Sequence, residues 1–310
     1  MDSINGHSLS SRGKKNNLAI LQKTLISFYM LLFSNTILSN EYITSCEQLL
    51  NQKQYEKALQ YANNAKKINK SNYKITFCRG QANLNLKNFD NAFLDFEESN
   101  KLAINDTDRS ISILLAATSL RAGNRPEEAI SLSRSFIASI RNNFAFKRLF
   151  LNEIAESLIL LRKFDEAGAT FLEAYNLAAN IDERAANLDR AAFTYASLKN
   201  FTKAIEFGLK ANLAFEQTSS LAAYAESGIN LGLYYLENND LDSAERTFFK
   251  FDKLLRENGE MYYLAKVLYA ESKYYKKISN VLLSNTKLDE ANKIANDIRA
   301  EDLKILFKGD

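Results

Sequence analysis

The residue types that most often perform acid–base and metal chemistry are almost absent from this chain. Its 310 residues contain one histidine, His7, which lies in an N-terminal stretch that we expect to be disordered or removed. A histidine-based triad, a histidine-rich metal site and a histidine general base are therefore excluded from the folded part. The sequence also lacks a glycine-rich phosphate loop and the GxSxG, HExxH and EF-hand patterns.

Paired carboxylates offer another route to acid–base chemistry, as in Glu97-Glu98 and Glu127-Glu128. Adjacent residues on a helix point in different directions, so these pairs do not converge on a substrate and are interpreted as solvated surface. An enzyme would need a site made of lysine, tyrosine or carboxylate groups alone. We therefore predict a non-catalytic protein that holds no cofactor and no metal.

The chain contains two cysteines, Cys46 and Cys78. Neither has a CxxC partner or a nearby histidine, so we interpret both as small buried hydrophobic residues and not as a metal or redox site. Two thiols without an apparent disulfide framework do not define the cellular compartment.

Small residues recur along the chain with a period of 34 to 40 residues. They are Ala58, Ala92, Ala129, Ala167, Ala204, Ala244 and Ser284. A repeat of this period indicates a stacked array of one supersecondary unit. The positions three before, four after and seven after each small residue share one face of a helix, which we call helix B.

A second small residue lies twelve positions before each member of the first series and marks another amphipathic helix, helix A. This second series is Cys46, Gly80, Ala117, Ala155, Ala192, Gly232 and Ser272. Two antiparallel helices approach closely only where one side chain is nearly absent, and an aromatic side chain of the partner then fills the gap. The recurrence predicts that helix A packs on helix B in every unit.

This pattern resembles the tetratricopeptide repeat, whose motif has a small residue in helix A followed by aromatic and alanine positions down helix B. The best matches are Gly80–Asn83–Phe89–Ala92–Phe96 and Gly232–Tyr235–Leu241–Ala244–Phe248. Two features of the motif are missing: the chain has no tryptophan, and its one proline, Pro126, lies in the first turn of a helix B. Units longer than 34 residues carry their extra residues between one helix B and the next helix A. This arrangement resembles the longer tetratricopeptide variants found in bacterial regulators and sensors.

The resemblance implies an all-α fold, a right-handed α-solenoid of about seven helix-turn-helix repeats over residues 40–297. We expect one elongated array, closed by a C-terminal capping helix within residues 298–310. The hairpin spacing is constant, since nine residues separate the small residue of helix A from the large residue that opens helix B, from Cys46 to Tyr55 and from Ser272 to Val281.

Residues 1–39 do not fit the repeat. A basic stretch ends at Lys23, and an apolar run over 24–33 and a small-polar stretch over 34–39 follow, which is the order of a secretory signal. We predict a signal peptide or an N-terminal membrane anchor, and hence an exported or envelope-associated protein of the periplasm or cell envelope. The alternative is that residues 18–38 form an N-terminal helix of the solenoid, which would leave the protein in the cytoplasm.

The net charge of +3 is carried by the first 23 residues, and the remainder is neutral. A protein that binds nucleic acid through its phosphates would show a basic stripe over its fold. The repeat region has none, so nucleic acid is not an expected partner.

The resemblance places a partner-binding groove on the helix-A residues three before and one after each small residue. These are Phe77, Gln81, Leu114, Thr118, Asn152, Glu156, Asp189, Phe193, Ile229, Leu233, Tyr269 and Lys273. Such a mixed lining suits an extended peptide or a helix of another protein. The alternative is that Phe193, Ile229 and Leu233 pack against neighbouring helices as core.

Two further binding sites are considered, one known from the resembled family and one suggested by the charges. The Lys/Asn clamp of chaperone-binding members is absent, because Ile43 and Glu47 stand at its places in the first unit. Four lysines of the last helix A could bind an acidic partner or lipid headgroups, although a solvated face is the alternative. They are Lys266, Lys273, Lys276 and Lys277.

The sequence therefore favours a protein-interaction scaffold that presents its groove to a partner protein. A signalling receptor that binds a short peptide is the second hypothesis, and it lacks a recognisable output domain in this sequence. An enzyme is the third.

Overall fold

The computed structural model describes residues 40–140 and 143–308, and within these ranges every regular element is a helix. The all-α fold class is therefore confirmed. The segment 1–39, predicted as a signal peptide or anchor, lies outside the described residues. The described chain divides into two compact units, a first unit that ends at Arg125 and a second that begins at Pro126. The division falls inside the third repeat, where Pro126 takes the place of the large side chain that opens most other B helices.

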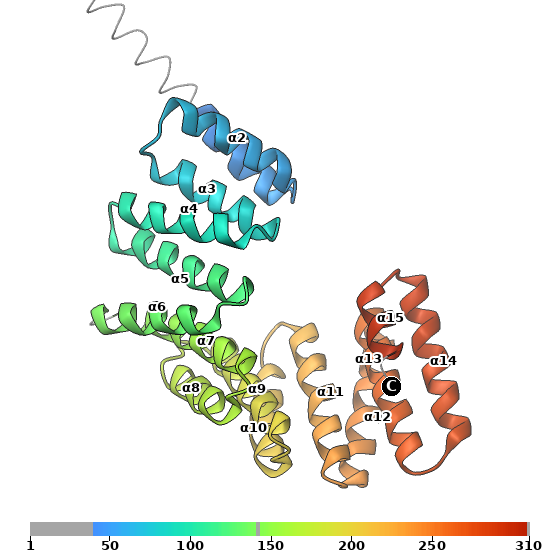
Figure 1. The fold of residues 1–310 in the computed structure, drawn as a ribbon. Coiled ribbons are helices and arrows are strands. Elements are labelled where there is room, and N and C mark those ends of the chain that lie inside the picture. Colours follow the sequence, from blue (N-terminus) through green and yellow to red (C-terminus); the bar gives the residue numbers. More distant parts are fainter. Residues whose placement is uncertain (1–39, 141–142, 309–310) are drawn as a thin grey trace, which may run out of the picture. The chain divides into compact units, whose positions relative to one another are not determined.

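The first unit contains two helix pairs and one further A helix. A helix over residues 40–51 precedes α2 (Tyr55–Ile68), and α3 (Tyr73–Asn85) packs between α2 and α4 (Phe89–Leu102). The last helix of this unit, α5 (Asp106–Ala122), packs on α4. Figure 1 shows these helices stacked in chain order.

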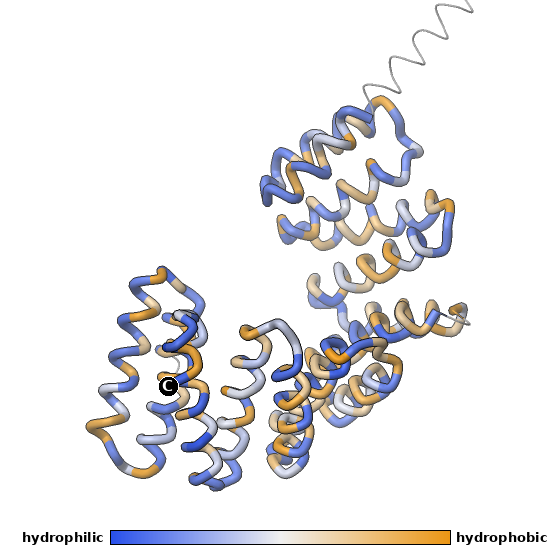
Figure 2. The backbone as a smooth tube through the Cα atoms, turned by 180° about the vertical axis from the view of Figure 1, so that it is seen from behind, coloured by the Kyte–Doolittle hydropathy of each residue, from blue (hydrophilic) through white to orange (hydrophobic). Residues whose placement is uncertain are grey.

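The second unit continues the alternation, and each helix packs on the next along the chain. Its helices are α6 (Pro126–Ser139), α7 (Phe144–Leu160), α8 (Phe164–Asn176), α9 (Ile181–Ser197), α10 (Phe201–Phe215), α11 (Leu221–Glu237), α12 (Leu241–Asn258), α13 (Met261–Lys277), α14 (Val281–Asp297) and α15 (Glu301–Lys308). The odd-numbered helices from α7 to α13 are A helices, and the even-numbered helices are B helices. Hydrophobic and hydrophilic residues alternate around most of them (Figure 2), as expected for helices with one buried face.

One backbone turn joins helix A to helix B in all seven repeats. Its central residue, five positions before the small residue of helix B, adopts a left-handed conformation with φ between 57° and 62°. These residues are Lys53, Lys87, Asn124, Arg162, Lys199, Asn239 and Ser279. The next residue donates its amide to a carbonyl five positions back, as Asn200 does to Tyr195 at 2.9 Å. This hydrogen bond is the Schellman closure of a helix end, made here without glycine.

Most A helices begin at an asparagine or serine cap. The side chain accepts a hydrogen bond from the amide three residues on, which satisfies one of the free donors of the first helical turn. The capping residues are Asn72, Asn105, Asn143, Asn180 and Ser220. These caps fix where each A helix starts after junctions of different length.

The small residues allow the close helix contacts that the sequence predicted. A Cβ atom on Gly80 would lie 2.8 Å from the ring of Phe96, and one on Gly232 would overlap the ring of Phe248. Both phenylalanines are fully buried. The aromatic side chain of helix B thus fills the space that a side chain on helix A would take.

The C-terminal segment forms the helix that the sequence placed there. In α15, Leu303 and Phe307 are buried, and the Phe307 ring centroid lies 4.7 Å from that of Tyr269 in α13. The Tyr269 hydroxyl donates a hydrogen bond to the Leu306 carbonyl at 3.3 Å. Helix α15 therefore covers apolar surface of the last repeat.

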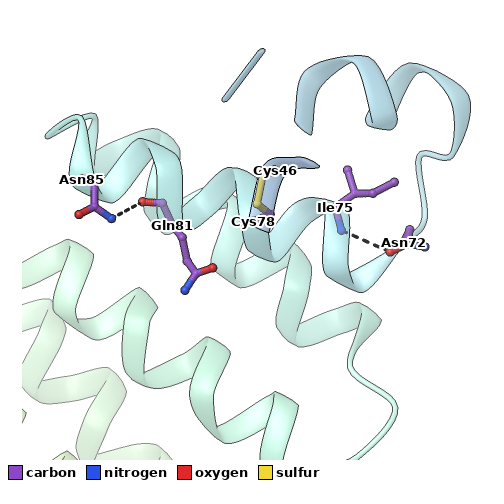
Figure 3. The surroundings of a disulfide bond; sticks show 6 residues. All are labelled: Cys46, Asn72, Ile75, Cys78, Gln81 and Asn85. Carbon is purple, nitrogen blue, oxygen red and sulfur yellow. Dashed lines mark hydrogen bonds between the residues drawn. A yellow bond between two sulfur atoms is a disulfide. The ribbon is translucent and has the colours of Figure 1, made fainter. Parts of the chain in front are cut away.

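The interpretation of the cysteines as separate thiols is wrong, because Cys46 and Cys78 form a disulfide (Figure 3). Their Cα atoms lie 6.5 Å apart, within the range that a disulfide spans. The bond joins the helix over 40–51 to α3, which are consecutive A helices. A separation of 32 residues is close to one repeat, so stacking brings the two positions together.

Candidate functional site: the helix-A face

We use the term helix-A face, in each unit separately, for the surface formed by the predicted groove residues of that unit and their neighbours on its A helices. In the first unit this face is half-buried. Phe77 stacks on Tyr73 at 5.4 Å between ring centroids and meets the edge of Phe96 at 5.7 Å. The Thr118 hydroxyl donates to the Leu114 carbonyl at 3.0 Å. Phe77 and Leu114 therefore contribute to packing as well as to the surface.

Gln81 lines a polar cavity of about 420 Å³ at the N-terminal end of the first unit. The other lining residues are Glu47, Leu50, Asn51, Tyr55 and Asn85. Gln81 and Asn85 lie on α3, on the same helix as the disulfide residue Cys78 (Figure 3). The cavity therefore lies between the first two repeats.

Ion pairs connect consecutive A helices in the second unit. Arg148 of α7 binds Glu183 of α9 at 2.5 Å, and Arg190 of α9 binds Glu156 of α7 at the same distance. Glu226 of α11 binds Lys266 of α13, also at 2.5 Å. Each pair spans 34 to 40 residues, which is one repeat. These contacts hold α7 beside α9 and α11 beside α13.

Two predicted groove residues carry buried polar atoms on this face. Asn152 of α7 and Asp189 of α9 stand at equivalent positions of consecutive repeats. Asn152 Oδ1 and Asp189 Oδ1 are shielded from solvent and have no hydrogen-bond partner in the described chain. Burial raises the pKa of Asp189 from 3.8 to about 6, although Ser227 and Arg190 oppose that rise. The Asp189 carboxyl therefore changes its protonation state closer to neutral pH than an exposed aspartate does.

The apolar groove residues divide between surface and core. Phe193 is 40% exposed, and the Arg190 guanidinium lies 5.2 Å from its ring centroid. Ile229 is buried, and Leu233 packs against the large core of the last repeats. Of the three residues for which a core role was the alternative, Phe193 alone presents a large exposed surface.

The last predicted groove pair and the lysine cluster are engaged within the chain. Tyr269 is buried beneath α15, and the Lys273 ammonium lies 4.7 Å from its ring centroid. Lys266 pairs with Glu226, and Lys277 donates to the Leu236 carbonyl. Lys276 is exposed. Much of the positive charge of this cluster is thus directed to other groups of the protein.

Sequence reasoning missed the groups that surround Asp189 and join the A helices. Arg190 and Ser227 are neither small nor aromatic, so the repeat motif does not mark them. A comparison of residues one repeat apart would have found the pairs Glu156–Arg190 and Glu226–Lys266, because each joins opposite charges at that spacing.

The described residues hold no group of histidine, cysteine, aspartate or glutamate side chains placed to bind a metal ion. Glu127 and Glu128 are exposed, as predicted, whereas Glu98 pairs with Lys66. Within residues 40–140 and 143–308, no helix combines the length and the apolar character needed to cross a membrane.

Neither a family model nor a curated protein sequence matches this chain. Solved structures do match it. Aspartyl phosphate phosphatase F from Bacillus subtilis is 14% identical with a TM-score of 0.60, and the match covers 95% of this chain and 96% of that one. A kinesin light chain with TPR-like repeats from Podosopora anserina is 13% identical with a TM-score of 0.56, covering 64% and 99%.

The Cut9 chain of the APC/C hetero-tetramer Cut9-Hcn1 is 18% identical with a TM-score of 0.55. That match covers 86% of this chain and 48% of the other. Identities this low establish a shared fold and no shared activity. From its paired A and B helices, its recurring small residues and these structural likenesses, the chain has a tetratricopeptide-like helical repeat fold.

Proposed function

We propose that this protein is a non-catalytic interaction scaffold that binds a peptide or a helix of a partner protein on its helix-A face. The observation that carries the proposal is the cross-linking of consecutive A helices by ion pairs, which leaves Phe193 exposed on the same face as Asn152 and Asp189. An apolar anchor beside a few fixed polar groups is what peptide recognition requires. The structural likeness to the Cut9 chain, which was solved in an assembly with Hcn1, is consistent with this role.

A test compares the full-length protein with two variants as baits in its native cells. Phe193→Asp places a charge on the helix-A face. Leu209→Asp, on the B helix α10, is a matched control because Leu209 is 42% exposed against 40% for Phe193. A partner kept by the wild type and by Leu209→Asp but lost by Phe193→Asp supports the proposal. A partner kept equally by all three contradicts the assignment to this face.

A receptor for a short peptide is the alternative form of the same binding role. It predicts that a bound peptide changes the curvature of the repeat stack, whereas a scaffold keeps its dimensions. Small-angle scattering with and without the captured partner segment separates the two. A decrease in the radius of gyration on binding favours the receptor.

We further propose that the protein is exported or held at the cell envelope. The basic and apolar order of residues 1–39 supports export, and the Cys46–Cys78 disulfide supports an oxidising compartment, because thiols stay reduced in most cytosols. Cell fractionation combined with thiol labelling tests this proposal. A cytoplasmic protein with both thiols free would overturn it.

A further inference from the structure

Buried polar atoms without a hydrogen-bond partner gather on two consecutive A helices of the second unit. They are Arg148 Nε and Asn152 Oδ1 on α7 and Asp189 Oδ1 and Arg190 Nε on α9, while the Ser227 hydroxyl of α11 lies against the Asp189 carboxyl and lowers its pKa through a hydrogen bond. A buried donor or acceptor that lacks a partner costs free energy, so native proteins rarely gather several of them. Their presence on one face indicates a surface built to bond something outside the chain.

The charges around this cluster are balanced except at Asp189. Three salt bridges pair the nearby cations with carboxylates: Arg148 with Glu183, Arg190 with Glu156, and Lys266 with Glu226. Among residues 40–140 and 143–308, no salt bridge of Asp189 is found, and the cation that acts on it, Arg190, binds Glu156. The cluster therefore carries one excess negative charge in a poorly solvated place, where a charge interacts strongly with an incoming ion.

The pKa shifts of Asp189 and Tyr234 agree with an excess negative charge at this place. The pKa of Asp189 is raised to about 6, first by burial and then by the Glu226 carboxylate, against the lowering effects of Ser227 and Arg190. On α11, burial and the nearby Asp189 charge raise the pKa of Tyr234. The site thus disfavours a further negative charge and would be stabilised by a positive one.

We infer that Asp189 anchors a hydrogen-bond-donating cation of the bound partner chain, namely a lysine or arginine side chain or a free N-terminal ammonium group. This inference rests on the proposed function. Asn152, one repeat earlier, offers a second acceptor on the same face. Phe193 lies one helical turn after Asp189, so its exposed ring can contact the methylene groups that carry the cation.

The experiment screens an immobilised random pentapeptide library against the full-length, disulfide-bonded protein at pH 7.5. Asp189→Asn removes the charge while keeping the shape of the side chain. Asp182→Asn, in the exposed first turn of the same helix, is the matched control. Thermal unfolding followed by circular dichroism confirms that both variants fold.

We expect the wild type and Asp182→Asn to enrich lysine or arginine at one position, or a free amino terminus, and Asp189→Asn to lose that enrichment. Blocked peptides then separate the sources of the cation. For a side-chain cation, replacing the selected arginine by neutral citrulline should weaken wild-type binding at least about tenfold, since truncating a buried charge contact typically has an effect of that size or more. The same replacement should leave binding to Asp189→Asn unchanged.

The pH dependence gives a readout that a purely structural role would not produce. The groups that act on Asp189 are Arg190 on its own helix and Glu226 and Tyr234 on α11, while Glu156 on α7 acts through Arg190. Binding of the basic peptide should weaken in the wild type as the pH falls from 7.5 to 5.5, and Asp189→Asn should not share this loss.

Peptides retained without basic enrichment, or retained with the same enrichment by Asp189→Asn, would overturn the inference and leave the proposed function standing. Failure of the wild type to retain any peptide would count against the peptide-binding function itself. The two failures are therefore distinguishable.

Discussion

Gly228 of α11 lies directly against the ring of Phe251 of α12, and a Cβ atom on this glycine would overlap the ring. Phe251 is fully buried and also meets Tyr224 at 5.0 Å between ring centroids. The close approach of these two helices therefore depends on the absence of one side chain.

Gly228→Ala should destabilise the second unit by about 1 to 3 kcal/mol, because overpacking forces the ring or the helix to move. Gly208→Ala is the control, since its new Cβ would meet its neighbours at an ordinary 3.4 Å. The higher helix propensity of alanine should leave Gly208→Ala neutral or slightly more stable. Denaturant unfolding of both variants measures the difference. Equal stability would mean that α11 and α12 do not pack as closely as described.

Reduction of the disulfide should destabilise the first unit. Its N-terminal core is built from small side chains, namely Cys46, Ala58, Ala62, Cys78 and Ala82. Because little apolar area is buried there, the disulfide between the A helices contributes a larger share of the stability of this unit. For the chain it encloses, the loop-entropy relation predicts a loss of about 3 to 4 kcal/mol.

Hydrogen exchange of the double variant Cys46→Ala/Cys78→Ala checks this prediction. Amides of α2 and α3 should lose protection, while those of α11 to α14 should keep theirs. Uniform loss across both units would show that the chain unfolds as one body.

Asp189→Asn should raise stability at neutral pH. The folded-state pKa of about 6 lies above the ordinary 3.8, so the native state binds more protons than the unfolded state between these values. The wild type therefore loses unfolding free energy as the pH rises from about 4 to about 7, by roughly 2 to 3 kcal/mol in total.

The stability gap between Asp189→Asn and the wild type should therefore be small at pH 4 and reach its full size at pH 7.5. Urea unfolding at both pH values measures it. A gap that does not change with pH would mean that Asp189 titrates normally. A gain in stability from removing the carboxyl would support its retention for binding, since functional sites often reduce stability.

Ala204→Phe tests the register of the fifth repeat. Ala204 is fully buried in a cluster with Ala192, Tyr195 and Tyr234. A phenylalanine there should lower the unfolding free energy by about 1 to 3 kcal/mol through overpacking. An unchanged melting temperature would show that the helix positions assigned in this repeat are wrong.

The sequence predicted those parts of the fold that repeat. Small residues at one spacing identified both helices of each unit, and the contacts Gly80–Phe96 and Gly232–Phe248 have the predicted geometry. A helix was also expected within residues 298–310, and α15 lies there with Leu303 and Phe307 buried.

The features that the sequence did not predict arise from pairs one repeat apart. Cys46 and Cys78 are joined only because the first two A helices stack. Arg190 likewise meets Glu156 through stacking, and the position of neither residue is marked by a motif. Phe193 and Leu233 occupy equivalent positions in neighbouring repeats, yet the first is 40% exposed and the second packs against the core. Such differences depend on the local size of neighbouring side chains, which a period does not describe.

The turn between helix A and helix B has a consequence for how the chain folds. The left-handed residue of this turn, such as Lys199, has a Cβ atom, which makes the left-handed conformation unfavourable in an isolated hairpin. A single hairpin should therefore close poorly by itself and become stable when a neighbouring hairpin packs on it. Because every hairpin joins residues close in sequence, contact order is low, and folding should start at one repeat and spread rapidly along the stack. The same turn recurs at Arg299, between α14 and α15, where folding of the last helix would complete this propagation.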